Sequence, residues 1–324
     1  MLYKDAGVNI DKLNLIKKGI GSQVVKTFQK RDSAFGLFGG IYPYRDEYLV
    51  SSVDGVGTKI LVACGMGRHE TIGMDIVNHC INDILTTGAR PLFFMDYIAF
   101  SEINRNILMD IVKGLVVACK KERVVLVGGE TAQLARFYPK GVYDLAGFIV
   151  GVVNKKEYIN PEVITPGDIL LGLKSSGLHT NGYSLARKVL LMKYSFSSYI
   201  PELKCTIGEE LLKVHLCYRR VLEPRFRYIH GLAHITGGGF YDNIARILPP
   251  GVSAVVRKKS WRVPAIFRLI QKLGRVPEEE MYRVFNMGIG MVVIIPPHNL
   301  RYFKSLKPLV IGEVVKGDFG VKLE

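Results

Sequence analysis

The feature that most constrains the fold is the stretch 48–59, YLVSSVDGVGTK. Its first half is an apolar, β-branched run that predicts a buried strand, and its second half breaks abruptly into an acid, two glycines, a hydroxyl and a cation. The glycines let the backbone approach a ligand, while Asp54, Thr58 and Lys59 offer a metal ligand, a hydroxyl and a positive charge. This combination is typical of a nucleotide-phosphate and magnesium site, and the alternative is a polar turn between two strands.

A second polar feature lies on the helix that apolar spacing predicts over 71–87. Its polar side chains fall on one stripe, at Asp75, His79, Asn82 and Thr86, with Asp83 beside it. A helix face in water usually carries lysine and glutamate. Short acids, amides and a histidine instead favour a stripe that faces a ligand.

The pattern of a strand followed by glycine and an acid returns in the first half. Strands are predicted over 60–63, 91–100, 124–127 and 143–153, with a helix over 103–121. The third of these strands runs into Gly128, Gly129, Glu130 and Thr131. Acids thus occur at strand ends, on the helix stripe or inside apolar runs, at Asp54, Asp75, Asp83, Asp96, Glu130 and Asp144. Magnesium explains them economically, because it recruits one or two carboxylates plus phosphate oxygens. Neither the Walker pattern nor the Rossmann glycine pattern is present, so the site is of another type.

The polar, proline-punctuated stretch 154–168 is the best domain boundary, and it predicts an N-terminal domain over 1–166 and a C-terminal α+β domain over 167–324. Two loops in the second half suit anions, because each precedes a predicted helix whose free amides would face the loop. One is 175–184, SSGLHTNGYS, and the other is the run Gly237 to Gly239. His179, at the centre of the first loop, is a candidate acid–base group. The glycine- and aromatic-rich segment 35–44 is interpreted as either a lid or a surface loop.

Charge and cysteine content bound the partners. The 44 lysines and arginines against 29 acids give a formal charge of +15, which favours acidic partners such as nucleic acid, phosphorylated metabolites or anionic membrane. The cations are dispersed, no RNA-binding aromatic signature or zinc-finger spacing occurs, and no apolar run reaches membrane-spanning length. The 5 cysteines are odd in number and have no C-x-x-C pair, which is typical of reduced thiols. We therefore expect a cytoplasmic protein acting on a small molecule, without nucleic-acid or membrane partners.

Eight sequence blocks together resemble the phosphoribosylformylglycinamidine cyclo-ligases, also called aminoimidazole ribonucleotide synthetases. They occur in order from residue 4 to residue 291 as KDAGV, SSVDGVGTK, IGMDIVNHCINDILTTGARPLFF, VGGETA, YDLAGFIVGVV, SSGLHTNGYSL, AHITGGGFYDNI and MYRVFNMGIGM. The resemblance implies a ligase of purine biosynthesis that uses ATP to close the imidazole ring of formylglycinamidine ribonucleotide through an iminophosphate, releasing ADP and phosphate. Within the same superfamily, thiamine-phosphate kinase and selenophosphate synthetase are the alternatives. The second is disfavoured because no cysteine precedes Cys64. A basic nucleic-acid-binding module is the alternative from another class.

The resemblance also implies a fold and a set of site residues. The expected fold is α+β, with an N-terminal α/β domain whose sheet pairs with that of a second subunit into a barrel, so that the protein is a homodimer. The expected cofactors are ATP and Mg²⁺, with K⁺ as a further candidate. The implied magnesium ligands are Asp54, Asp83 and Glu130, and the implied catalytic residues are His179, Asp83 and Lys59. The implied nucleotide or ribose-phosphate contacts are Asp54, Gly55, Gly57, Thr58, Asp75, Asn82, Gly128, Gly129, Glu130, Thr131, Ser176, Asn181, Gly237, Gly238 and Gly239.

Overall fold

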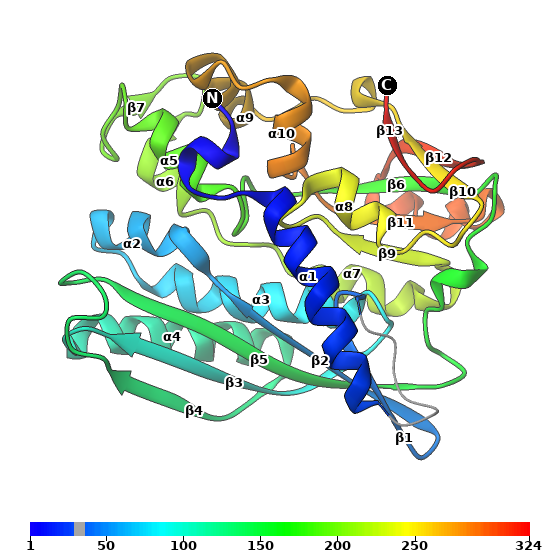
Figure 1. Cartoon of the computed structure of the whole chain (residues 1–324), viewed down its shortest axis with the longest axis horizontal. Coiled ribbons are helices and arrows are strands. Elements are labelled where there is room, and N and C mark those ends of the chain that lie inside the picture. The colour runs from blue at the N-terminus through cyan, green and yellow to red at the C-terminus, as the bar shows by residue number, and fades with distance from the viewer. Residues whose placement is uncertain (29–35) are drawn as a thin grey trace.

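The computed structural model describes residues 1–28 and 36–324, which form two large β-sheets with helices packed against them (Figure 1). The first sheet has the strand order β1-β2-β5-β3-β4, and only β3 and β4 run parallel. Its strands are β1 (Gly40–Tyr44), β2 (Glu47–Gly55), β3 (Arg90–Phe100), β4 (Val125–Gln133) and β5 (Tyr143–Asn154). The helices of this half are α1 (Ile10–Val24), α2 (Ile60–Met66), α3 (Glu70–Leu85) and α4 (Arg105–Glu122).

The second sheet is built from the second half of the chain, in the order β13-β10-β12-β6-β11-β9. Its strands are β6 (Ile169–Lys174), β9 (Gly231–His234), β10 (Val252–Val256), β11 (Ile289–Ile295), β12 (Leu309–Lys316) and β13 (Gly320–Leu323). Its helices are α5 (Tyr183–Leu190), α6 (Ile207–Leu211), α7 (Arg219–Leu222), α8 (Gly239–Ala245), α9 (Ala265–Gly274) and α10 (Glu278–Val284), and β7 (Tyr199–Ile200) pairs with β8 (Cys205–Thr206) in a small hairpin. Every residue of β11 is buried, as expected for a central strand covered on both faces.

Helix α3 lies between the first sheet and the second half of the chain. It packs on β2, β3 and β5 and on α4, and it also contacts α7 and β9 from the second half. Of its 16 residues 13 are buried, including the polar stripe. A helix buried on nearly all sides must satisfy its polar groups within the protein. The stripe is therefore an internal junction and not a wet surface.

The other face of the first sheet is open. Val53, Phe148 and Met95 form one row across β2, β5 and β3, and Val53 is 69% exposed. Tyr97 and Val125 are also exposed, at 37% and 61%. A sheet face with this many exposed apolar side chains is typical of an interaction surface.

Three elements predicted from the sequence differ from those in the structure. Residues 60–63 begin α2 and are not a strand, because a short apolar run fits either element. Gly128 to Thr131 lie inside β4 and do not follow it as a loop. Of the segment 35–44, Gly40–Tyr44 is an edge strand paired with β2, whereas residue 35 lies outside the described residues.

Within the described ranges, no helix is long and apolar enough to cross a lipid bilayer.

The contact between α3 and α4 depends on two glycines. A Cβ added at Gly73 would lie 2.2 Å from the carbonyl oxygen of Ile111, and one added at Gly114 would lie 1.9 Å from the carbonyl oxygen of Glu70. Both obstacles are backbone atoms, so no side-chain rotation relieves the clash. The two helices can approach this closely only with glycine at both positions.

Gly114→Ala is therefore expected to lower the free energy of unfolding by about 3 kcal/mol, because the helices must separate to admit the methyl group. Urea denaturation followed by circular dichroism measures it. The matched control is Gly19→Ala in α1, where no atom lies within 4 Å of the added Cβ. Equal losses in the two variants would contradict the close-contact account.

Candidate active site

The polar stripe of α3 is bonded to the irregular segment 213–218 of the second half. The carboxylate of Asp75 accepts a hydrogen bond from the backbone N–H of His215 at 2.7 Å, and Asn78 Nδ2 donates to the carbonyl of the same residue at 2.7 Å. Asn82 Oδ1 accepts from the N–H of Tyr218 at 3.0 Å, and its Nδ2 donates to the carbonyl of Leu216 at 2.7 Å. Asp75 and Asn82, two predicted ligand contacts, thus join the two halves of the chain.

Lys59 is also part of this junction. Its Nζ lies 2.7 Å from Asp75 Oδ2 and donates to the carbonyl of Lys213 at 2.7 Å, and both side chains are 0% exposed. Burial lowers the pKa of Lys59, and the adjacent carboxylate opposes that shift. A fully buried ammonium held by two partners does not face a phosphate. This geometry does not support the predicted phosphate-binding role of Lys59.

Two carboxylates and two imidazoles meet where β2, α3 and β9 converge. Asp54, at the end of β2, has Oδ2 2.8 Å from His79 Nε2 of α3. One turn further along α3, Asp83 accepts a hydrogen bond from His234 Nδ1 at 2.8 Å, and its other oxygen accepts from Ser52 Oγ at 2.9 Å. Asp83, His79 and His234 are buried, whereas the side chain of Asp54 is 41% exposed. Asp54 is therefore the member of the group that a ligand can reach from outside.

The charges in this group act on one another. Burial alone lowers the pKa of His79, but the carboxylates of Asp54 and Asp83 outweigh it and raise that pKa to about 9. Burial raises the pKa of Asp54, yet the neighbouring His79 lowers it overall. For His234, burial lowers the pKa in spite of Asp83.

Hydrogen bonds continue from His79 to His234 through two further residues. His79 Nδ1 is 2.7 Å from Thr180 Oγ1, which lies 3.3 Å from His215 Nδ1, and His215 Nε2 is 3.0 Å from His234 Nε2. The ring of His179 stacks on that of His215 at a centroid distance of 3.9 Å. Four histidines from α3, β9 and two loops thus share one buried space.

His179 itself is held in an unusual backbone conformation. Its φ of 60° lies in the left-handed region, where residues with a side chain are uncommon and often functional. Burial brings its pKa well below the ordinary value, so the ring is neutral. Its Nε2 accepts from the N–H of Ser176 at 3.2 Å, which leaves the proton on Nδ1, an atom with no partner. The side chain is 1% exposed.

The predicted anion-binding loops have internal partners. Ser176 Oγ donates to the carbonyl of Val214 at 2.5 Å. A Cβ on Gly239 would lie 1.9 Å from the carbonyl oxygen of Tyr282, so this glycine permits a close backbone contact. Gly237 lies beside Asn181, because its Cβ would be 3.2 Å from Asn181 Oδ1. The structure brings the two loops together but does not require a phosphate to explain the glycines.

The remaining predicted residues fall in two places. Gly55, Gly57 and Thr58 follow Asp54, and Thr58 Oγ1 is 3.0 Å from Ser184 Oγ.

Gly128, Gly129, Glu130 and Thr131 lie in β4, which is separated from β2 by β5 and β3. A Cβ added at Gly129 would lie 2.6 Å from Asp96 Oδ1. The charge of Asp96 in turn helps to raise the pKa of Cys119 in α4, so Gly129 and Asp96 lie on the helix side of the sheet. Side chains alternate along a strand, so Glu130 points to the open face of the sheet. Within one copy of the chain, Glu130 is not brought to Asp54 and Asp83.

Three residues of the site were not predicted. His234 lies in the block AHITGGGFYDNI, where its place beside the glycines was a usable signal. His215 stands in an apolar run, and nothing local marks it. Arg246 follows α8, and its guanidinium lies over the ring of Phe38, with Cζ 4.4 Å from the ring centroid. The charges of Asp83, Asp242 and Asp54 oppose the lowering of its pKa by burial. Only the fold brings Arg246 near these carboxylates.

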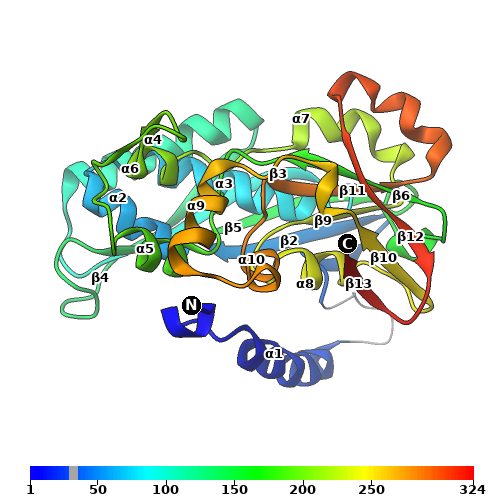
Figure 2. The ribbon, with the colours of Figure 1, turned by 90° about the horizontal axis from the view of Figure 1, so that it is seen from above.

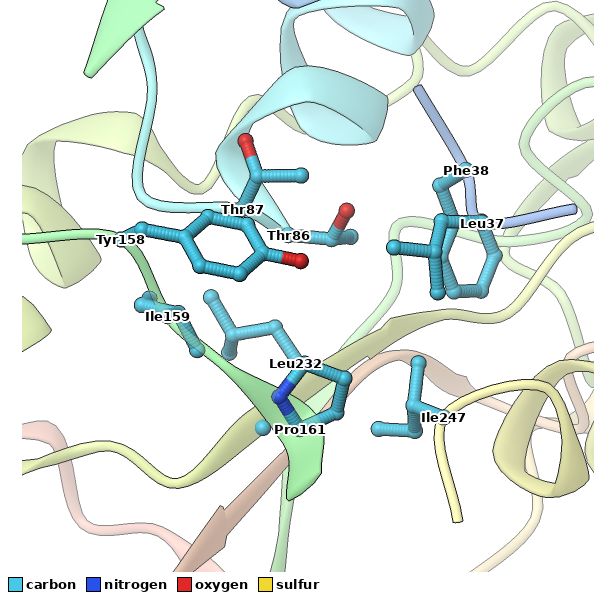
Figure 3. A pocket seen from close by; sticks show the side chains of 10 residues that line it. Leu37, Phe38, Thr86, Thr87, Tyr158, Ile159, Pro161, Leu232 and Ile247 are labelled. Atoms are coloured by element: carbon cyan, nitrogen blue, oxygen red, sulfur yellow. The ribbon is translucent and has the colours of Figure 1, made fainter. Parts of the chain in front are cut away.

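Two hollows in the described residues do not fit the predicted substrates. The pocket in Figure 3, at the end of α3, is lined mainly by apolar side chains such as Leu37, Phe38 and Leu232. Its volume of about 10 Å³ admits no more than one water molecule. A larger hollow of about 410 Å³ lies between the end of α4 and α7, but its Arg219 and Arg220 already bind backbone carbonyls of α4.

Comparison with known proteins gives consistent matches over the whole chain. The family model described as AIR synthase related protein, N-terminal domain, matches residues 39–153, and the corresponding C-terminal domain model matches residues 165–324. A phosphoribosylformylglycinamidine cyclo-ligase of Thermoanaerobacter sp. (strain X514) is 47% identical over 339 aligned positions, covering 100% of both chains. A chloroplastic phosphoribosylformylglycinamidine cyclo-ligase of Arabidopsis thaliana is 43% identical over 325 positions, covering 98% of this chain and 82% of the relative.

Solved structures support the fold. The thiamine monophosphate kinase of Aquifex aeolicus aligns with a TM-score of 0.66 at 18% identity, covering 100% of this chain and 98% of that one. A hydrogenase maturation protein, HypE, in complex with ATP aligns with a TM-score of 0.61 at 18% identity, covering 85% and 81% of the two chains. At such identities the likeness shows the fold alone. It confirms the predicted α+β class.

Lys59→Met is expected to lower the free energy of unfolding by about 3–5 kcal/mol, because it leaves the buried Asp75 carboxylate without its partner. Urea denaturation at neutral pH measures this loss. The matched control is Lys258→Met, whose pair with Glu278 at 2.6 Å is solvent-exposed. Its expected cost is below about 1 kcal/mol. Similar losses at the two sites would contradict the account of a buried junction.

The raised pKa of His79 makes stability depend on pH. A histidine whose pKa is about 9 when folded and 6.5 when unfolded contributes stability that is complete below pH 6.5 and is lost as pH rises through 9. The expected loss is up to about 3 kcal/mol. Denaturation in EDTA between pH 6.5 and 9.5 should show this slope for the native protein and not for His79→Asn. The same slope in both proteins would show that another group causes it.

Proposed function

The chain belongs to the phosphoribosylformylglycinamidine cyclo-ligase family, and we propose that it closes the imidazole ring of formylglycinamidine ribonucleotide to give aminoimidazole ribonucleotide in purine biosynthesis. The observation that carries this proposal is the convergence of Asp54, Asp83 and the His179 loop at one junction between two matched family domains. We place the boundary between these domains at residues 166 and 167. The cytoplasmic location and any role for K⁺ stay predictions.

The chemistry needs ATP because the formyl amide oxygen of the substrate is a poor leaving group. In the proposed reaction the amide oxygen takes the γ-phosphoryl group of ATP, and ADP departs. The amidine nitrogen then attacks the formyl carbon that carries this oxygen. The C–O bond then breaks, phosphate and a proton are released, and the ring is closed. Phosphoryl transfer depends mainly on positioning and on neutralising charge, so the protein has to hold two ligands in line.

Asp54 fits the predicted magnesium site best. Its carboxylate is partly exposed at the end of β2, whereas both oxygens of Asp83 already accept hydrogen bonds from Ser52 and His234. Asp54 would therefore hold the Mg²⁺ that accompanies ATP, and this ion would supply charge neutralisation at the phosphates. We further propose that Arg246, and not the buried Lys59, contributes the protein's positive charge there, because the charges of Asp83 and Asp54 act on its guanidinium.

We assign His179 to proton transfer at the substrate amide. Its neutral ring with an unpartnered Nδ1–H suits a group that donates a hydrogen bond to an oxygen and exchanges a proton. The ring is 1% exposed, so substrate reaches it only when the 175–181 loop moves. The left-handed backbone at His179 is consistent with a loop held away from its most relaxed conformation.

The open sheet face supports a homodimer in which a second copy covers Val53, Tyr97 and Val125. Glu130 lies on this same face, at the far edge from Asp54. We propose that Glu130 serves the site of the second copy, because its own Asp54 is three strands away.

The purified protein incubated with ATP, Mg²⁺ and formylglycinamidine ribonucleotide is expected to release ADP and aminoimidazole ribonucleotide in equal amounts. His179→Asn should lower kcat by about 100-fold or more, because proton transfer by a positioned side chain contributes that much. His298→Asn, at an exposed position of the 3-10 helix Pro297–Tyr302 after β11, serves as the control and should keep full activity. ADP release without the substrate, or with thiamine monophosphate instead, would overturn the cyclo-ligase proposal in favour of another phosphoryl acceptor.

Mixing two inactive variants tests the role of Glu130. If Glu130 acts across a dimer, Glu130→Gln and Asp54→Asn refolded together should recover about a quarter of native activity, because half of the dimers are mixed and each has one intact site. Each variant alone should stay inactive, and analytical ultracentrifugation confirms the dimer. No recovery in a mixture that contains mixed dimers would contradict a role across the interface.

A further inference from the structure

Two tyrosines and two arginines form one stack on the surface of the second half of the chain. The rings of Tyr228 and Tyr302 are parallel, with centroids 3.7 Å apart and an angle of 7° between their planes. Arg227 Cζ lies 4.7 Å from the centroid of Tyr228, and Arg301 Cζ lies 4.8 Å from that of Tyr302. No side chain fits between rings 3.7 Å apart, so each guanidinium lies over the outer face of its tyrosine. We call this group the arginine–tyrosine stack.

Hydrogen bonds hold both guanidinium groups in place. Arg227 Nη2 donates to Tyr228 Oη at 2.5 Å, and Arg301 Nη2 donates to Tyr302 Oη at 2.9 Å. Both arginines are exposed, and the nearby acid Glu223 is already paired with another arginine. Neither stacked arginine forms an ion pair with any residue that the structure describes. Their remaining N–H groups are therefore oriented but available to an acceptor in solvent.

Further cations surround the stack, and its own segments contain no acid. Residues 224–228 and 297–308 include neither aspartate nor glutamate, and they carry five cations, Arg225, Arg227, Arg301, Lys304 and Lys307. Arg225 connects the two segments, because its Nε donates to the carbonyl of Tyr302 at 2.8 Å. These cations are far apart in the sequence, where they count as dispersed charge. The fold gathers them on one surface.

The hollow of about 410 Å³ between the end of α4 and α7 lies next to this surface. Its lining includes Glu223 and Pro224, the first two residues of the 3-10 helix Glu223–Tyr228, whose last two residues belong to the stack. A 3-10 helix rises about 2 Å per residue, so the hollow and the stack are about 10 Å apart. The hollow adds four cations, Lys121, Arg123, Arg219 and Arg220, against two acids. Figure 2 shows α4, α7 and the orange-red turns after β11 along one edge of the molecule.

The chemistry of this surface favours nucleic acid among the partners that carry many negative charges. Protein interfaces and membrane-binding helices bury apolar side chains, but no large apolar side chain of 219–228 or 297–308 is exposed. A guanidinium plane instead offers a flat face on which a nucleobase can stack, and its edge donates to phosphate. Bases in a duplex are already stacked on one another, so only unpaired bases can use such a face.

We propose that the arginine–tyrosine stack and the cations around it bind single-stranded nucleic acid. Bases stack on the outer faces of Arg227 and Arg301, while these arginines, Lys304 and Lys307 bind phosphates. The hollow beside α7 accommodates the adjoining part of the strand. This surface is a second site, and the proposal does not depend on the reaction that the protein catalyses. It replaces the expectation from the sequence that nucleic acid is not a partner.

The test is fluorescence anisotropy of the full-length protein with fluorescein-labelled oligo(U) and oligo(dT) of about 12 nucleotides, a length that such sites can cover. Between about 50 and 200 mM salt, four phosphate contacts should give a slope of about −3 for log K against log salt concentration. Binding of both strands, or of one in preference, supports the proposal and identifies RNA or DNA as the source of the ligand.

Three variants separate stacking from charge. The double variant Arg227→Gln, Arg301→Gln should weaken binding by about 10-fold or more and make the slope less steep by about 1.4. Tyr302→Leu keeps every cation, so it should weaken binding about 2–5-fold with an unchanged slope. The matched control is Arg262→Gln, an exposed arginine outside this surface, which should leave affinity and slope unchanged. Circular dichroism confirms that each variant is folded.

Competition identifies the class of partner. An abasic strand with the same number of phosphates, a polyglutamate peptide and phosphatidylserine vesicles should each displace the labelled strand less well than unlabelled oligo(U). Equal displacement by the abasic strand would show attraction to charge alone, and stronger displacement by the peptide or the vesicles would assign the surface to a protein or a membrane. Any of these results, no binding at about 50 mM salt, or equal losses in Arg262→Gln and the double variant would overturn the proposal.

Discussion

The interaction on which the structure depends is the burial of the polar stripe of α3 between the first sheet and the second half of the chain. A buried polar group without a partner is costly, so each member of the stripe needs a specific partner at a fixed distance. Asp75, Asn78 and Asn82 find theirs in the backbone of segment 213–218, which has no regular structure of its own. The two halves therefore cannot separate or slide without leaving several polar groups unsatisfied. Figure 2 shows α3 running through the middle of the molecule, with elements of both halves around it.

This constraint also places the chemistry. Because α3 is fixed, its next polar residues, His79 and Asp83, stand opposite Asp54 and His234 at set distances. Lys59 and Asp75 form a fully buried ion pair within the junction. This burial lets them stabilise the fold and also keeps them from contacting a ligand. The site is thus divided between residues that hold the two halves together and the few that a ligand can reach, of which Asp54 is the most exposed.

The sequence predicted much of this from local patterns. The apolar period of α3 and the unusual stripe upon it were visible, as were most strands and both loops at His179 and the three glycines. What it could not predict were contacts made across the chain. His215 and His234 lie more than 130 residues from their partners on α3, and no periodicity records such a distance. The same limit applies to Glu130, because the predicted strand ended at residue 127, and neither its extension to Gln133 nor the face of the sheet on which Glu130 lies could be predicted.

Two short apolar stretches show the other limit. Residues 60–63 fit a strand or a helix equally well. The 3-10 helix Gly57–Lys59 directly precedes them, and the chain continues from it as α2. The glycines at 128 and 129 favoured a loop, but residues 128–131 pair with β3 and belong to β4. At position 129 only glycine fits beside Asp96. In both cases tertiary packing outweighed local preference.

Hydrogen exchange of the native protein in low urea tests most directly whether the stripe of α3 joins the two halves. The backbone amides of His215 and Tyr218 are bonded only to side chains of α3, so they exchange when the junction opens. The account predicts that segment 213–218 and the middle of α3 exchange with the same free energy and the same dependence on urea. Fast exchange of segment 213–218, at the rate of an exposed loop while α3 stays protected, would contradict it.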